Sequence, residues 1–317
     1  MRTERRQPST GWFIGPAGSL ICYRGRQCRA VSVRPSHSMP AARVVLWVST
    51  VGALALALRS IAMGPPPLWL ALAVMFGYLS ICGIGIIYPR GEMFADVIEC
   101  GEPGRSLVGL TFDDGPEPAT TPRILQALSD RGYRATFFVI GRKAEQHPEL
   151  VRAIVAAGHE LGIHGYSHDR LTAWRAPSRI VEDIRKAQDV VFSLVGQHII
   201  WYRPPVGHVS PRTAAAVRKA DVELVAWTVR CLDGLRRSNP RRVVRCVERR
   251  LRDGAIIMLH DAAERSDFIP AGVTAINEIL DVIQNRGFTS VTLSELLVTE
   301  SSNGNGTTAQ TTALGKV

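Results

Sequence analysis

The stretch Leu107 to Pro116 (LVGLTFDDGP) joins a largely apolar run to two adjacent carboxylates and a Gly-Pro turn. A short apolar run of this kind predicts a buried strand, here Leu107–Phe112. Two neighbouring carboxylates at the end of a strand repel each other unless a cation or a proton separates them. The stretch therefore predicts a strand that ends in a chemically active pair, Asp113 and Asp114.

Short apolar runs alternate with amphipathic helical patterns around this stretch, and several of the helical patterns begin with Pro, which suits a first turn. Repeated βα units predict a parallel sheet, and about seven units predict a distorted (β/α)7-type barrel. The predicted strands are Leu107–Phe112, Ala135–Ile140, Glu160–His164, Ile199–Tyr202, Val222–Val229, Ala255–Leu259 and Thr289–Val291. The predicted helices are Pro122–Arg131, Pro148–Ala157, Pro177–Val195, Pro211–Ala220, Pro240–Arg252 and Pro270–Arg286.

Two long apolar runs precede this region. Val44–Leu58 is almost continuous, and Leu68–Tyr88 has 21 residues without a charge, enough to cross a bilayer. The Gly-Pro-Pro-Pro run between them must break a helix. Residues 44–90 therefore predict a transmembrane hairpin of a bacterial inner membrane, with spans at about 44–62 and 68–88. The basic residues before it favour the cytoplasmic side for the following domain, whereas a first run that stops short of spanning places that domain outside.

The charge of the chain is unevenly distributed. The net charge is +10, but residues 1–43 contain eight Arg and one Glu, so +7 lies there and only +3 remains elsewhere. A nearly neutral body argues against nucleic-acid binding, and nothing in the sequence indicates a protein partner. Residues 1–43 and 299–317 have no core-forming pattern and are predicted to be disordered tails. The six cysteines form no C-x-x-C pair and are expected to be free thiols.

Four further stretches place polar side chains after predicted strands, at the face where β/α barrels have their active sites. His164 and His168 are spaced for a divalent metal that takes a carboxylate as its third ligand. Arg203 precedes a rigid Pro-Pro turn and is suited to fixing a carboxylate. Asp233 and His260 each end a predicted strand, so we expect the carboxylate to be a partner for a histidine.

These five stretches, in this order, resemble the five motifs of the polysaccharide deacetylases with a NodB-homology domain (carbohydrate esterase family four). The resemblance covers residues 105–298. The roles that it implies are a catalytic base at Asp113, metal ligands at Asp114, His164 and His168, usually for zinc, a base-orienting residue at Arg203, and a general acid at His260 with Asp233 as its partner. It also implies substrate contacts at Pro204, at the backbone amide of Val206, and at Leu259 beside the acetyl methyl.

The sequence departs from the family pattern in its fourth motif, which usually carries two Asp and then Trp. Arg230 stands at the first Asp position and Gly234 at the Trp position. Both positions belong to the wall of the substrate groove, so the expected reaction is unaffected and the substrate stays open.

The expected function is that of a membrane-anchored, metal-dependent hydrolase that removes an N-acetyl or other N-acyl group from an amino sugar in a polysaccharide or a lipid-linked glycan. Amide hydrolysis needs an activated water, a polarised carbonyl and a proton for the departing amine, and the residues above supply all three. The alternatives are a deformylase or deacylase of a polyprenyl-linked sugar, an O-deacetylase, and a catalytically inactive sugar-binding module. A non-haem iron oxygenase shares the two-His-one-carboxylate set but needs neither Asp113 nor His260.

Overall fold

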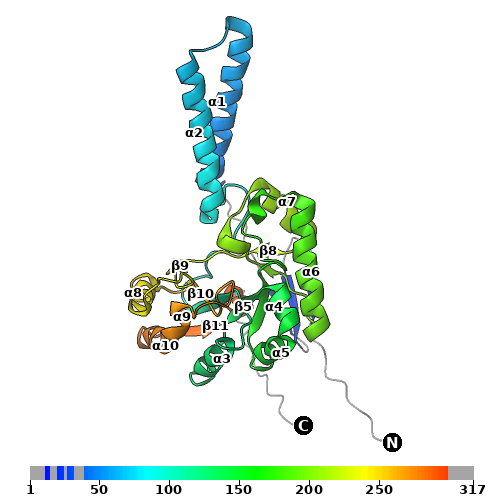
Figure 1. Cartoon of the computed structure of the whole chain (residues 1–317), viewed down its shortest axis with the longest axis vertical. Helices are drawn as coiled ribbons and strands as arrows, with labels where there is room; N and C mark the ends of the chain where they lie inside the picture. Colours follow the sequence, from blue (N-terminus) through cyan, green and yellow to red (C-terminus); the bar gives the residue numbers. More distant parts are fainter. Residues whose placement is uncertain (1–10, 15–19, 25–26, 32–38, 299–317) are drawn as a thin grey trace, which may run out of the picture.

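A parallel sheet forms the centre of the molecule (Figure 1). The computed structural model describes residues 11–14, 20–24, 27–31 and 39–298. The strand order is β8-β7-β6-β5-β4-β10-β9, and β11 pairs with the first half of β4. The strands are β4 (Leu107–Asp113), β5 (Thr136–Val139), β6 (Glu160–Ile163), β7 (Trp201–Tyr202), β8 (Glu223–Leu224), β9 (Val229–Arg230), β10 (Ile256–His260) and β11 (Thr289–Val291).

The two central strands, β4 and β10, are buried along almost their whole length. Such strands read as near-continuous apolar runs because both faces are covered. One face packs on a ring of helices, and Figure 1 shows these helices around the sheet. They are α3 (Thr121–Ser129), α4 (Gly141–Gln146), α5 (Pro148–Ala156), α6 (Pro177–Val195), α7 (Pro211–Ala220), α8 (Pro240–Arg250), α9 (Ala271–Thr274), α10 (Ile276–Asn285) and α11 (Leu293–Leu297).

The sheet curls into a half-barrel, so the prediction of a (β/α)7-type barrel is confirmed only in its parallel βα architecture. The edge strands β8 and β9 have two residues each and are not paired with each other. Between them, Ile98 donates its N–H to the Leu224 carbonyl and accepts from Ala226. The predicted strand Val222–Val229 is therefore interrupted, because Leu224 and Ala226 bond to this crossing segment, although Val225 still donates to Tyr202 of β7.

Most predicted helices are present, and Pro occupies the first turn of five of them, α3, α5, α6, α7 and α8. The predicted helix Pro270–Arg286 is wrong as a single element, because the chain breaks at Ala275 between α9 and α10. Two short helices, α4 and α11, were not predicted. Neither is long enough to show a clear apolar period.

Two long helices, α1 (Ala41–Met63) and α2 (Leu68–Ile87), project side by side from the body (Figure 1). Both are long and apolar enough to cross a membrane, and α1 has no buried residue. Their base is attached directly to the domain: Arg43 Nη2 lies 2.5 Å from Asp96 Oδ1, and the Ile86 carbonyl accepts the N–H of Val209. No flexible linker separates α2 from the body, because a short 3-10 turn at Pro89–Gly91 follows immediately.

Part of the segment predicted to be a disordered tail contains strands. β1 (Gly11–Ile14), β2 (Leu20–Arg24) and β3 (Gln27–Val31) form a separate antiparallel sheet, and α1 begins two residues before the predicted boundary at Arg43. The short apolar runs of β1 and β2 were the available signal. The other residues up to 38, and the predicted tail at 299–317, lie outside the described residues.

Candidate active site

The carboxyl ends of the strands surround a pocket of about 300 Å³. Asp113 ends β4, His164 directly follows β6, and His260 ends β10. The parallel register pairs His260 with Asp113. Strand pairing therefore brings a carboxylate and an imidazole from distant parts of the sequence to the same level of the pocket.

Asp114, His164 and His168 form a buried cluster in this pocket. Asp114 Oδ1 lies 3.4 Å from His164 Nε2 and 3.1 Å from His168 Nε2, and the three ligand atoms lie within 4.8 Å of one another. Among the described residues this oxygen has no hydrogen-bond partner, although it is buried. A buried carboxylate oxygen is costly without a compensating group. The three residues therefore fit a divalent metal, as the sequence predicted; the cluster itself does not identify which one.

The outer nitrogens of both imidazoles face acceptors. His164 Nδ1 lies 2.7 Å from the carbonyl oxygen of Arg203, and His168 Nδ1 lies 3.4 Å from Glu264 Oε1. Because a carbonyl only accepts, His164 Nδ1 donates to it, and Nε2 lies on the side of Asp114. Carboxylates and carbonyls hold metal-binding histidines in this way. Burial alone would raise the pKa of Asp114, but the two facing imidazoles hold that pKa well below its ordinary value.

Asp113 is held from behind by a fully buried arginine. Arg203 Nη1 donates to Asp113 Oδ1 at 2.7 Å and to Thr111 Oγ1 at 2.9 Å, while Nη2 donates to the Ala226 carbonyl at 2.8 Å. The guanidinium also lies over the ring of Phe138, 4.1 Å from its centroid. Arg203 does not line the pocket itself, so it can orient Asp113 without contacting a ligand there.

His260 has a buried carboxylate partner, as the sequence predicted for Asp233. His260 Nδ1 lies 3.0 Å from Asp233 Oδ1, and the His260 N–H donates to Oδ2 at 2.9 Å. Burial would lower the pKa of His260, but the charge of Asp233 and its hydrogen bond outweigh burial and raise that pKa to about 10. The imidazole is therefore a proton donor at neutral pH, and its free Nε2 is available to the pocket.

Four residues of the pocket wall that are not glycine have left-handed backbone angles. They are Asp114 (φ 74°), His168 (φ 55°), Val206 (φ 64°) and Leu232 (φ 55°). This conformation costs of order 1–3 kcal/mol for such residues and tends to occur where a site requires it. Among the described residues, no acceptor takes the N–H of Val206. That N–H is therefore free for a bound group.

One substrate residue expected from the sequence lies elsewhere. Leu259 is fully buried and is absent from the pocket wall, which Met258 lines instead. Side chains alternate along a strand, so the face that presents His260 must also present Met258 and turn Leu259 away. Pro204 is buried next to the pocket but does not line it.

Sequence reasoning missed Asp183, which lies outside the pocket and supports one of its loops, and it missed several residues of the pocket wall. Asp183 on α6 accepts from the N–H groups of Tyr166 and Ser167 and so supports the loop between the two metal-site histidines. Its position within an amphipathic helix gave no signal. The remaining wall residues that the sequence did not indicate are Arg170, Trp227, Leu232, Leu235, Arg236, Met258, Glu264, Arg265, Asp267 and Phe268.

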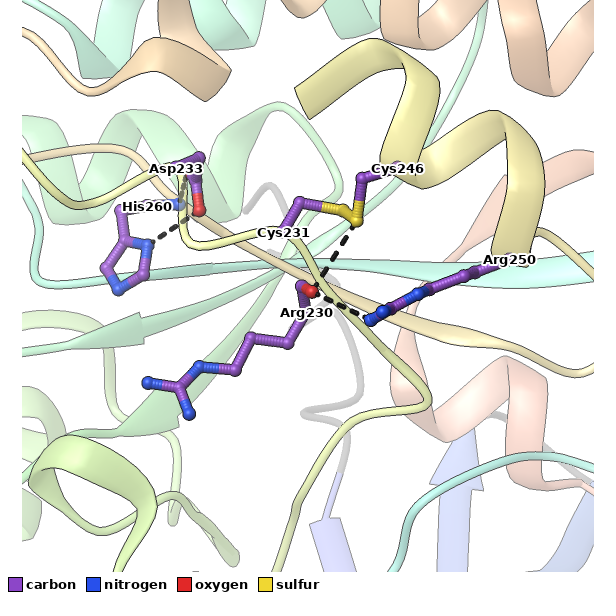
Figure 2. The surroundings of a disulfide bond; sticks show 6 residues. All are labelled: Arg230, Cys231, Asp233, Cys246, Arg250 and His260. Atoms are coloured by element: carbon purple, nitrogen blue, oxygen red, sulfur yellow. Dashed lines mark hydrogen bonds and ion pairs between the residues drawn. A yellow bond between two sulfur atoms is a disulfide. The ribbon is translucent and has the colours of Figure 1, made fainter. Parts of the chain in front are cut away.

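A disulfide joins Cys231 to Cys246, with their Cα atoms 5.7 Å apart, so the expectation of free thiols is wrong for this pair. Cys82 and Cys100 are free. The two bonded cysteines lie on the loop after β9 and on α8, which the chain brings together only by folding. Figure 2 shows the bond beside the loop that carries Asp233, on the opposite side from the His260 ring.

A parallel half-barrel with a buried carboxylate–dihistidine cluster at its strand ends defines a class of metal-binding α/β domains. The family model "Polysaccharide deacetylase" matches residues 101–225. The chain is 34% identical over 194 residues to a chitooligosaccharide deacetylase from Bradyrhizobium, covering 58% of this chain and 88% of the relative. The chain belongs to the polysaccharide deacetylase family, of the NodB-homology type.

Two further relatives show how much of the chain the similarity covers. The peptidoglycan-N-acetylmuramic acid deacetylase PdaC of Bacillus subtilis is 33% identical over 198 residues, which cover 62% of this chain and only 40% of that protein. The structure of a family 4 carbohydrate esterase from Streptomyces lividans in complex with acetate matches with a TM-score of 0.53 at 31% identity, over 59% of this chain and 92% of that one. The likeness covers the βα domain and stops short of the full length of the larger relatives.

Proposed function

We propose that this protein is a metal-dependent hydrolase that removes the N-acetyl group from an amino sugar of a glycan. The observation that carries the proposal is the pairing of Asp113 with His260 beside the cluster of Asp114, His164 and His168. A hydrolase needs a base on one side of the scissile bond and an acid on the other. The glycans named for the relatives, peptidoglycan and chitooligosaccharides, are the substrate class that we propose here.

The roles of the residues follow from their positions. Asp113, oriented by Arg203, takes a proton from the attacking water. His260, charged through Asp233, gives a proton to the departing nitrogen, and the free N–H of Val206 donates to the amide oxygen as negative charge develops there. Asp114 and the two histidines would hold a divalent metal, which would supply polarisation of the carbonyl and a lowered pKa of water. The product pair is then a free amine and acetate.

The complete set of groups argues against the inactive sugar-binding module, because such a module has no need for a buried Arg203–Asp113 pair and a charged His260. The same groups would also hydrolyse an acetyl ester or a formyl amide. O-deacetylation and deformylation of a polyprenyl-linked sugar are therefore distinguished by substrate, and not by the site.

We also propose that α1 and α2 anchor the domain in a membrane, with the domain on the oxidising side. The charge distribution favoured the cytoplasm, but a disulfide between Cys231 and Cys246 is rare in cytosolic proteins and common outside them. A bond of this kind outweighs the charge rule, which is a bias counted mainly over short loops. The proposed location also gives the pocket access to cell-wall glycan.

The proposal is tested with the full chain purified in detergent and loaded with zinc. We expect release of acetate and free amine from N-acetylglucosamine oligomers, and loss of about 10²-fold or more in turnover for Asp113→Asn with its metal retained. Equal turnover by Asp113→Asn and the unchanged protein would refute the mechanism. Labelling Cys100 in intact cells with an impermeant thiol reagent, compared with a Cys100→Ser control, tests the side of the membrane; labelling only after the cells are opened would refute the proposed orientation.

A further inference from the structure

We propose that Arg230 makes this pocket selective for glycans that carry an anionic group, a carboxylate or a phosphate, on or beside the acetylated amino sugar. The inference rests on the proposed function and adds the charge of the substrate to it. It starts from a departure of this sequence, in which a guanidinium stands where the family usually has a carboxylate.

The pocket wall contains four arginines, and two of them are neutralised. Arg236 pairs with Asp267 at 2.5 Å, and Arg170 lies 3.9 Å from Glu264. Within residues 39–298, Arg230 has no carboxylate partner within 4.0 Å. The fourth arginine, Arg265, likewise has no carboxylate within 4.0 Å among the described residues, so Arg230 and Arg265 are the two pocket arginines without an ion pair.

Arg230 is positioned to use this charge. The carbon of its guanidinium lies 5.3 Å from the centroid of the Trp227 ring, and both residues line the pocket. An aromatic face restrains a guanidinium and leaves its N–H groups free to bind a planar anion by two hydrogen bonds. Figure 2 shows the Arg230 side chain extending to the same side as the His260 ring and away from the disulfide.

The backbone of Arg230 is also fixed. The next residue, Cys231, is bonded to Cys246, and the Arg230 carbonyl accepts a hydrogen bond from Arg250 Nη1 at 3.3 Å. A residue held in this way loses little freedom when it binds a ligand, and preorganisation of this kind favours affinity.

Gly234 packs against the ring of His260 in the same wall. A Cβ atom at this position would lie 2.8 Å from ring atoms of His260, so the loop has no room for the bulky residue that the family usually has here. Leu235 and Phe268 line the same pocket as His260 and Arg230. One pocket therefore contains both the acid of the proposed mechanism and the Arg230 guanidinium.

The test compares Arg230→Gln and Arg230→Lys with the unchanged full chain on three substrates of matched length. These are a neutral N-acetylglucosamine oligomer, an oligomer that contains N-acetylmuramic acid and so carries a carboxylate, and an N-acetylglucosamine oligomer that carries a phosphate. Arg249→Gln is the control, because it removes one exposed positive charge from α8 outside the pocket. Kd values for the same substrates, measured in the Asp113→Asn background, keep the test independent of turnover.

We expect the unchanged protein to favour an anionic substrate, and Arg230→Gln to lose about tenfold or more in kcat/KM on that substrate with at most a twofold change on the neutral one. Arg230→Lys should recover part of the loss, and Arg249→Gln should behave like the unchanged protein. The anionic substrate whose kcat/KM falls in Arg230→Gln identifies the carboxylate or the phosphate as the group recognised. Equal losses on neutral and anionic substrates, or equal Kd values for them in the unchanged protein, would overturn the inference. If the metal-loaded protein hydrolyses none of the three substrates, the proposed function itself is contradicted.

Discussion

The buried ion pair between Arg203 and Asp113 should show strong energetic coupling. The guanidinium is fully buried, the side chain of Asp113 is 3% exposed, and the two lie 2.7 Å apart. Arg203→Met leaves the Asp113 carboxylate buried without its partner and removes the donor to the Ala226 carbonyl. Breaking such a pair from one side costs about 3–5 kcal/mol, whereas Asp113→Asn keeps one acceptor oxygen and should cost about 2–3 kcal/mol.

The double variant removes both charges at once, so its loss should be smaller than the sum of the single losses by about 2 kcal/mol or more. The measurement is urea unfolding of the full chain in detergent, followed by tryptophan fluorescence, since Trp201 and Trp227 are buried in this region. Arg236→Gln is the control, because its pair with Asp267 is exposed to solvent and should contribute little to stability. Additivity within about 0.5 kcal/mol would refute the reasoning.

The other predictions concern the metal, the acid and the disulfide. His164→Ala should lose bound metal together with activity, and a metal-replete, fully active variant would contradict the ligand assignment. His260→Ala should keep its metal and lose amide turnover by about 10²-fold, but lose much less on an activated ester whose leaving group needs no proton; equal losses would show that it is not the acid. The raised pKa of His260 stabilises the fold fully below pH 6.5 and ceases to do so as pH rises through about 10. The difference in unfolding free energy between the unchanged protein and Asp233→Asn should therefore be larger at pH 7 than at pH 10.5, and a constant difference would contradict it. Cys231→Ser should lower the unfolding free energy by about 3 kcal/mol, because the bond closes a loop of 15 residues. Cys246→Ser and the double variant should lose the same amount as Cys231→Ser. A further loss in the double variant would argue against the bond.

Several residues of the candidate site could be predicted from the sequence because each directly follows or ends a strand. A polar residue after an apolar run marks the strand end, and parallel strands place all such ends at one edge. This reasoning located Asp113, Asp114, His164 and His260 without any contact information. Leu259 came from the family resemblance and not from this reasoning; the alternation of side chains along β10 turns it away from the pocket and places Met258 in the wall.

Contacts between distant segments could not be predicted in the same way. Asp183 supports the histidine loop from a helix whose pattern reads only as amphipathic. Cys231 and Cys246 have no motif spacing, and only the packing of α8 against the loop after β9 brings them together. The apolar run Val222–Val229 resembles one long strand, because burial and not strand pairing determines its composition. Tertiary contacts determine these features, and the local sequence pattern does not indicate such contacts.

In the proposed membrane-anchored arrangement, the direct attachment of α2 to the domain would limit where the pocket can act. Val209, whose N–H bonds to the last turn of α2 at Ile86, lies three residues after Val206. A catalytic domain on a long tether sweeps a large volume, but this one would stand at a constant height above the bilayer, with the orientation of its pocket set by the tilt of the hairpin. Glycan could then be processed only in a thin layer next to the membrane, where new strands emerge, and older material further out would escape. In that arrangement, inserting a flexible segment after α2 would give the pocket a much longer reach from the bilayer.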